Sequence, residues 1–161
     1  MDFFSTACQK PPFNHTLFGL CDDENGTRAY TNIDNPPSWI ATVKNDTAKT
    51  IVYTAIDKCV IKDHEFPGRG RCDCMLTTSD FLYLVELKNQ IPPWQTHAIE
   101  QLESTIQFLI ANHDVTSYKH KKAFACNKKR ERFAVIDNET NKYFFRTYRF
   151  RIDIQAEILI V

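Results

Sequence analysis

Residues 71–88 read RCDCMLTTSDFLYLVELK, and this stretch decides the fold class of the chain. Two largely apolar runs flank Ser79-Asp80, a pair of residue types that favours tight turns. If these two residues form a two-residue hairpin loop, Thr78 pairs with Phe81 and the register of the whole hairpin follows. That register predicts that Asp73 and Glu86 lie directly opposite each other, about 5 Å apart on one face.

The two faces of this predicted hairpin differ in polarity. Alternation along the strands places the charged residues on one face, which holds Asp73, Met75, Thr77, Leu82, Leu84, Glu86 and Lys88. The other face is apolar and holds Cys72, Cys74, Leu76, Phe81, Tyr83, Val85 and Leu87. Strands this apolar are usually buried on both sides, so we predict a buried polar cluster at the open end of the hairpin. The alternative is an exposed ion pair between Lys88 and one carboxylate, and a one-residue slip would move Asp73 to the other face.

Two opposed carboxylates repel each other, and a cation beside them would offset that repulsion. Lys88 is one such cation, and a divalent ion would have a larger effect. Hard ions such as Mg²⁺ (or Mn²⁺) prefer carboxylate oxygens, backbone carbonyls and water. Asp73, Glu86 and the backbone carbonyl of Leu87 are therefore candidate metal ligands. Lys88 is a candidate for orienting an attacking water molecule or neutralising a phosphate oxygen.

Around the hairpin, the sequence predicts a helix, three strands, a long helix and a strand, followed by a β-rich tail. The predicted segments are a short helix over 38–44, a strand over 50–61, a loop over 62–70, the hairpin strands 71–78 and 81–88, a helix over 94–112, a strand over 122–127 and one or two strands within 143–161. The long helix has the clearest pattern, because its apolar residues recur at spacings of three and four. Residues 1–35 are poorly patterned and predict an irregular segment, with a short helix or strand near 16–20.

This order of elements, with Asp73 on the first hairpin strand and Glu86-Leu87-Lys88 on the second, resembles the PD-(D/E)xK nuclease superfamily. Asp73 stands at the first acid of that motif, and Glu86 and Lys88 stand at its E-x-K. The resemblance implies an α/β (α+β) fold with a restriction-endonuclease-like core over residues 38–127, in which a mixed β-sheet is flanked by helices in the order α-β-β-β-α-β. A single domain would then span residues 1–161, with an irregular N-terminal segment over 1–35 and a β-rich C-terminal extension over 128–161.

The resemblance also implies an activity, that of a Mg²⁺-dependent nuclease hydrolysing phosphodiester bonds, with DNA as the expected substrate. The family's acids hold the metal, and its lysine assists the water and the scissile phosphate. Related members often place a glutamine on the long helix near the site, which makes Gln101 a further catalytic candidate; a solvated helix residue is the alternative. A catalytically inactive binding or assembly subunit, and a small defence effector that needs a partner, are the competing functions.

The chain departs from the family pattern at two points. Cys72 occupies the position of the motif's proline, and residues 38–45 contain no acid that could stand for the glutamate many members carry on the first helix. Asp57, in the preceding predicted strand, is a candidate extra metal ligand, because antiparallel pairing would place it on the face of Asp73. The alternative is an ordinary polar residue.

Positive charge is concentrated on both sides of the predicted strand over 122–127. The candidate nucleic-acid contacts are Lys121, Lys122, Lys128, Lys129 and Arg130, together with Arg69 and Arg71 in the glycine-containing turn that leads into Asp73. Aromatic residues alternate with arginines over 143–151, where either base stacking or core packing in a strand would suit the pattern.

The composition limits the function classes without selecting one. The 161 residues suit one domain, the 43% apolar content supports a core, and 20 acidic residues balance 20 basic ones. No apolar run approaches the length of a membrane span and the N-terminus does not resemble a signal peptide, so we expect no membrane partner and a cytoplasmic location. The six cysteines are expected to be reduced, with Cys72 and Cys74 buried. Specificity is expected to come from a partner protein or from a homo-oligomer.

Overall fold

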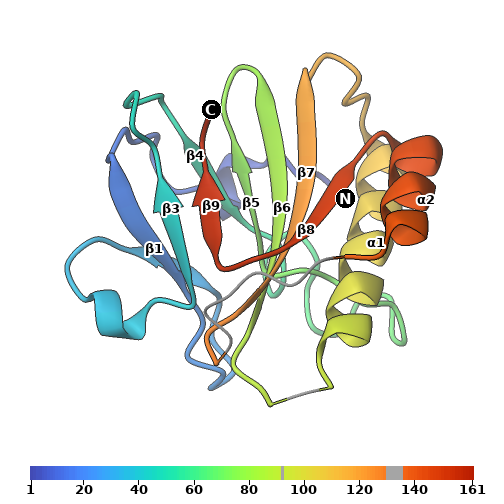
Figure 1. The fold of residues 1–161 in the computed structure, drawn as a ribbon, viewed down its shortest axis with the longest axis horizontal. Coiled ribbons are helices and arrows are strands. Elements are labelled where there is room, and N and C mark those ends of the chain that lie inside the picture. Colours follow the sequence, from blue (N-terminus) through green and yellow to red (C-terminus); the bar gives the residue numbers. More distant parts are fainter. Residues whose placement is uncertain (92, 130–135) are drawn as a thin grey trace.

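Two mixed β-sheets and two α-helices make up the fold of residues 1–91, 93–129 and 136–161, which the computed structural model describes (Figure 1). The five-stranded central sheet has the order β4 (Val52–Ala55), β5 (Cys74–Thr77), β6 (Phe81–Lys88), β7 (His120–Asn127) and β8 (Arg151–Ile154). The first three strands are antiparallel neighbours, whereas β7 runs parallel to both β6 and β8. The mixed α/β class predicted from the sequence is therefore confirmed.

The hairpin of β5 and β6 has the register predicted from its turn. Cys74 pairs with Val85 and Thr77 pairs with Leu82, as a two-residue loop at Ser79-Asp80 requires. The Thr78 amide donates a hydrogen bond to the Phe81 carbonyl at 3.0 Å, and the Thr78 hydroxyl accepts one from the Phe81 amide at 3.0 Å. The turn therefore satisfies its own backbone groups, which fixes the pairing of every residue behind it.

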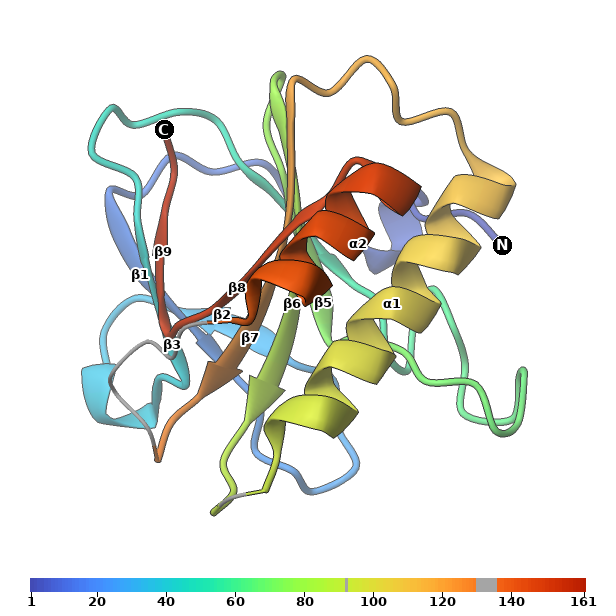
Figure 2. The ribbon, with the colours of Figure 1, turned by 45° about the vertical axis from the view of Figure 1, so that its right-hand side comes forward.

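One face of the central sheet is covered by helices. Helix α1 (Gln95–Asn112) forms the crossover between the parallel strands β6 and β7, and it buries Ala98, Leu102, Ile106 and Leu109 against the sheet. This confirms the helix predicted over 94–112. Helix α2 (Asn138–Tyr148) lies beside α1 on the same side (Figures 1 and 2). The Asp137 side chain caps α2 by accepting a hydrogen bond from the Thr140 amide at 2.9 Å.

The second sheet covers the opposite face. It has the order β2 (Tyr30–Asn32), β1 (Leu17–Cys21), β3 (Ala41–Lys44) and β9 (Glu157–Leu159), and short 3-10 helices precede β1 and β3 at Thr6–Cys8 and Pro36–Ser38. Phe18 and Val43 from this sheet pack with Tyr83 and Phe124 from the central one to form a second core. Gly19 has a structural role here, because a Cβ at this position would lie 2.0 Å from the Trp39 ring.

Three predictions of secondary structure differ from the structure. The strand predicted over 50–61 is confirmed only for β4, and the residues over 56–61, Asp57 included, form turns and isolated bridges. The helix predicted over 38–44 is strand β3, because Ala41 and Val43 alternate into the second core and pairing with β1 and β9 satisfies the backbone. The aromatic residues over 143–148 lie in helix α2, not in a strand, so the C-terminal extension is only partly β. Strands β8 and β9 do occur within 143–161, and β1 falls at the predicted element near 16–20.

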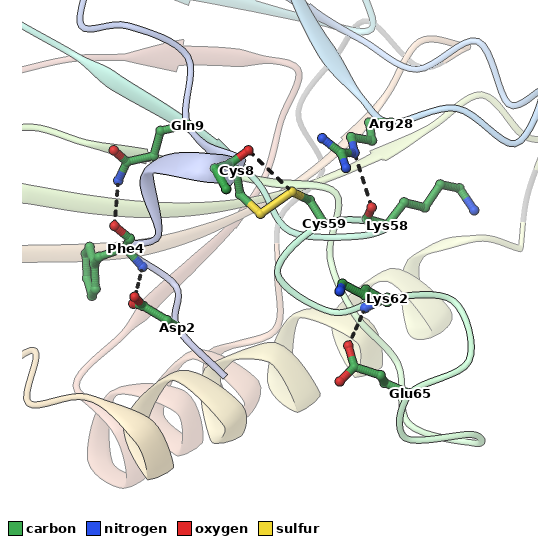
Figure 3. Close-up of a disulfide and its surroundings, with 10 residues drawn as sticks. Asp2, Phe4, Cys8, Gln9, Arg28, Lys58, Cys59, Lys62 and Glu65 are labelled. Carbon is green, nitrogen blue, oxygen red and sulfur yellow. Dashed lines mark hydrogen bonds between the residues drawn. A yellow bond between two sulfur atoms is a disulfide. The ribbon is translucent and has the colours of Figure 1, made fainter.

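The cysteine prediction is correct for four residues and wrong for two. Cys21, Cys72, Cys74 and Cys126 are free and buried, but Cys8 and Cys59 form a disulfide (Figure 3). Backbone hydrogen bonds from Lys10 to Tyr53 and from Phe13 to Ile51 align the N-terminal segment with β4, which brings Cys8 to the turn that holds Cys59. This long-range pairing had no local sequence signal. Among the described residues, no helix has the length and apolar character that crossing a membrane requires.

Candidate metal centre

Asp73, Glu86 and Lys88 come together on the α1-facing side of the hairpin, at its open end. Their exposed fractions are 8%, 2% and 7%, so all three are buried. Lys88 Nζ lies 3.0 Å from Glu86 Oε2. The arrangement is therefore the buried polar cluster that the sequence predicts, not an exposed ion pair.

Backbone hydrogen bonds fix Asp73 at the start of the hairpin. Its Oδ2 accepts a hydrogen bond from the Leu87 amide at 2.7 Å, and its own amide donates to the Val85 carbonyl at 3.1 Å. Cys72 is the exception to the predicted faces, since it lies in the α1-side core and its amide donates to Thr105 Oγ1 at 2.7 Å. The reason is that β5 begins at Cys74, so strict alternation does not extend back to Cys72.

Gln101 on α1 reaches this cluster, as predicted. Lys88 Nζ donates a hydrogen bond to Gln101 Oε1 at 2.7 Å, and Gln101 Nε2 donates to the Arg71 carbonyl at 3.4 Å. A Cβ on Gly70 would lie 3.1 Å from the Gln101 Cα, which is closer than ordinary contact. Because glycine has no Cβ, the segment that leads into β5 can approach α1 closely. Gln101 can then contact both the Arg71 carbonyl and Lys88.

The two carboxyl groups are electrostatically unfavourable in their ionised forms. Burial raises the pKa of Asp73 to about 7, although the hydrogen bond from the Leu87 amide opposes the rise. Burial and the nearby Asp73 carboxylate raise the pKa of Glu86 well above its usual range, while Lys88 acts in the opposite direction. A bound proton or a nearby cation would therefore stabilise both carboxyl groups.

One oxygen of the cluster has no partner. Glu86 Oε1 is buried and accepts no hydrogen bond among the described residues; when Glu86 is protonated, its carboxyl group can instead donate a hydrogen bond to the Asp73 carboxylate. An unsatisfied buried acceptor carries a desolvation penalty, which a bound cation would remove. A pair of buried carboxylates with a free acceptor fits a hard divalent ion whose other ligands are backbone carbonyl and water.

A third acidic ligand is missing from this set. Within residues 1–91, 93–129 and 136–161, no group of three or more His, Cys, Asp or Glu side chains could hold a metal ion. Asp57 lies 3.9 Å from Arg71 Nε, and its charge is close enough to contribute to the raised pKa of Asp73. Asp22, which follows β1, contributes in the same direction. The sequence analysis missed Asp22 because only the pairing of distant strands brings it near the hairpin.

Several of the predicted nucleic-acid contacts make side-chain interactions within the fold itself. Arg71 donates to the carbonyls of Lys62 and Glu65, and Arg69 donates to Ser104 and Gln107, so both arginines brace the loop and helix around the site. Lys122 Nζ lies 3.4 Å from Asp153.

The remaining candidate contacts lie on β7 and just beyond it. Lys121 lies over the Phe150 ring. The Lys128 amide donates to the Lys88 carbonyl at 2.9 Å, which places Lys128 and Lys129 just past the end of β6. Arg130 lies outside the described residues.

Comparisons of the chain with protein-family models, curated proteins and solved structures returned no match. The geometry of the cluster is therefore what supports a functional conclusion.

Proposed function

We propose that this chain is a divalent-metal-dependent nuclease with a restriction-endonuclease-like core, which hydrolyses phosphodiester bonds of nucleic acid, with DNA as the expected substrate. The observation that carries the proposal is the buried set of Asp73, Glu86 and Lys88, with an unpartnered oxygen on Glu86. Buried charges are rarely retained without a purpose, because their desolvation is costly.

The topology supports the proposed core. An antiparallel three-stranded meander is followed by a crossover helix and a parallel strand, which is the β-β-β-α-β part of the order that the family resemblance implies. The first helix of that order has no counterpart over 38–44, where β3 and the second sheet cover the face instead. Support for the family therefore comes from the central sheet and its site.

In the proposed mechanism, Asp73 and Glu86 would hold Mg²⁺ or Mn²⁺ together with the Leu87 carbonyl. Such an ion lowers the pKa of bound water and stabilises charge that develops on the phosphate. Lys88 has its Nζ held between Glu86 and Gln101, so it is fixed in position to donate to the attacking water or to a phosphate oxygen. Gln101 acts as a positioning residue, because it touches Lys88 and the Arg71 carbonyl.

A second candidate function is a catalytically inactive binding subunit with the same fold. The specific observation in its favour is that no third His, Cys, Asp or Glu side chain completes a metal-binding group among the described residues. Such a subunit would bind nucleic acid without cleaving it.

The disulfide bears on the cellular compartment of the protein. The cytoplasmic location predicted from the sequence stays a prediction, and the Cys8–Cys59 disulfide argues for an oxidising environment, where such bonds persist.

The proposed function is tested by incubating the purified protein with plasmid, linear duplex, single-stranded DNA and RNA, with Mg²⁺, Mn²⁺ or EDTA. We expect metal-dependent cleavage, with a loss of about 10³-fold or more in Asp73→Asn, Glu86→Gln and Lys88→Met. Asp80→Asn is a matched control. Asp80 lies in the turn of the same hairpin, and its carboxylate forms a weak, exposed ion pair with Lys119 at 3.9 Å. Equal cleavage by the wild type and all three variants would contradict the proposal, and binding without cleavage would favour the inactive subunit.

A further inference from the structure

The outer face of helix α2 and the adjoining strand β8 carry a cluster of cations around one exposed aromatic ring. Lys142 and Arg146 are four residues apart on one face of α2, Arg149 follows the last residue of the helix, and Arg151 opens β8 beside them. All four residues are exposed, and the Phe145 ring between them is 38% exposed. We call these five residues the α2 basic face.

The arginines of this face have unused hydrogen-bond donors. Among the described residues, Arg146, Arg149 and Arg151 make no side-chain hydrogen bond or ion pair, and Lys142 has one weak pair, at 4.0 Å from Glu139. Arg28, Arg69 and Arg71 differ, because each donates to a carbonyl or a polar side chain of the fold. Within residues 1–91, 93–129 and 136–161, the guanidinium groups with free donors are therefore those of Arg146, Arg149 and Arg151, not those of Arg69 and Arg71 beside the hairpin.

The face is hollowed and its cations are held in place. A depression of about 460 Å³ is lined by Asn138, Asn141 and the five residues of the face, with no acidic side chain in the lining. The guanidinium carbons of Arg149 and Arg151 lie 5.5 and 4.6 Å from the centre of the Phe145 ring. Stacking on an aromatic ring orders an arginine and leaves its in-plane donors free.

The fold keeps these cations together at an energetic cost. Arg149 has φ of 63°, a left-handed conformation that favours glycine, at the position that ends α2. Burial and the nearby Arg149 lower the pKa of Lys121, which shows that like charges crowd this end of the helix. A polyanion bound here would relieve the repulsion between the cations.

We propose that the α2 basic face binds the phosphodiester backbone of a nucleic acid, as a contact separate from the candidate metal centre. Planar guanidinium groups match the paired oxygens of a phosphate. Lys142 and Arg146 are separated by about 6 Å along the helix, and each DNA strand has a phosphate about every 3.4 Å along the axis, so the face can engage more than one phosphate. The proposal deepens the proposed nucleic-acid function, but it does not require cleavage.

The test is fluorescence anisotropy with a labelled 20-base-pair duplex and a single-stranded DNA of the same length, in EDTA so that cleavage plays no part. Arg146→Ala, Arg151→Ala and Arg149→Gly are each expected to weaken binding by about threefold to tenfold and to reduce the slope of log affinity against log salt by about 1. Lys119→Ala is the matched control, because Lys119 is equally charged and exposed but lies outside this face, and its loss should change affinity by less than about twofold.

Arg149→Gly separates a binding role from a structural one. Glycine relieves the left-handed backbone and preserves the hydrogen bond from residue 149 to the Phe145 carbonyl, so the melting temperature should stay the same or rise while binding weakens. Unchanged binding in all three variants would overturn the proposal, as would an equal loss in Lys119→Ala.

Other polyanions provide a further check. Tighter binding of a polyglutamate peptide or of phosphatidylserine vesicles than of either DNA, at the same salt concentration, would also overturn the proposal. The Asp73→Asn variant keeps the two proposals distinguishable, because it should lose cleavage and retain full binding. Binding through this face without any cleavage would leave the present inference in place and would remove only the catalytic function.

Discussion

Strand β6 is buried along its whole length, but its middle and its C-terminal end are buried at very different energetic costs. Its middle residues, Tyr83, Leu84 and Val85, are almost completely inaccessible and pack in the two cores. Glu86 and Lys88, which follow on the α1-facing side, are nearly as inaccessible, yet they bring charge into the interior beside Asp73. Burial of the apolar residues stabilises the fold, whereas burial of the carboxyl pair opposes it.

This contrast indicates that the charged residues at the end of β6 do not serve the stability of the fold. Asp73 and Glu86 both have raised pKa values, and one Glu86 oxygen lacks a partner. Neutral amide side chains at these two positions would keep an acceptor for the Leu87 amide and for Lys88 without the buried negative charge. The charged cluster is therefore expected to tolerate replacement by neutral groups, in contrast to its apolar neighbours.

The largest effect on stability is expected from Leu84→Ala, which removes an apolar side chain two residues before Glu86 on the same face. Loss of contacts in a fully buried site should lower the free energy of unfolding by about 2–5 kcal/mol. Urea denaturation measures this change. Leu17→Ala is a control, because Leu17 is 49% exposed and its loss should change stability by less than about 0.5 kcal/mol. A loss below about 1 kcal/mol in Leu84→Ala would contradict the description of β6 as a core strand.

A smaller effect of opposite sign is expected from Asp73→Asn in EDTA at pH 8. The pKa of Asp73 is about 7 in the folded chain, above its ordinary value of 3.8. The folded state therefore binds more protons than the unfolded state between these values, so stability falls as pH rises through this window. Asparagine cannot ionise, and we expect a gain of about 1–3 kcal/mol at pH 8 and a flatter pH profile. A variant less stable than the wild type at pH 8 would contradict the electrostatic account.

Much of the hairpin could be predicted from the sequence because its signals are local. Ser79-Asp80 sets the turn and thereby the register from Thr77–Leu82 to Cys74–Val85, which brings Asp73 to the side of Glu86 and Leu87. The spacing of apolar residues predicted helix α1, whereas the resemblance to the nuclease family is what singled out Gln101, which contacts Lys88. Each of these features depends on residues that are close in the sequence or on one clear repeat of apolar residues.

The parts that escaped prediction depend on contacts between distant segments. Ala41-Thr42-Val43-Lys44 becomes a strand because β1 and β9 lie on either side of it, which no local pattern reveals. The alternation of aromatic residues and arginines over 143–151 matched a strand, but Asp137 caps a helix that spans most of this stretch. The helix places Lys142 and Arg146 on one face and Arg149 at its end. The pairing of Cys8 with Cys59 and the approach of Asp22 to the hairpin likewise follow from tertiary structure.

The central claim, that Asp73 and Glu86 form a metal site, is tested most directly by the melting temperature of the wild type and of Asp73→Asn over a titration of Mn²⁺ at pH 8 and at pH 6. We expect Mn²⁺ to raise the melting temperature of the wild type, and to raise it more at pH 8 than at pH 6, because metal binding requires ionised carboxylates. The melting temperature of Asp73→Asn should not change with Mn²⁺. A melting temperature that does not respond to Mn²⁺ in the wild type, or that rises equally in Asp73→Asn, would contradict the claim.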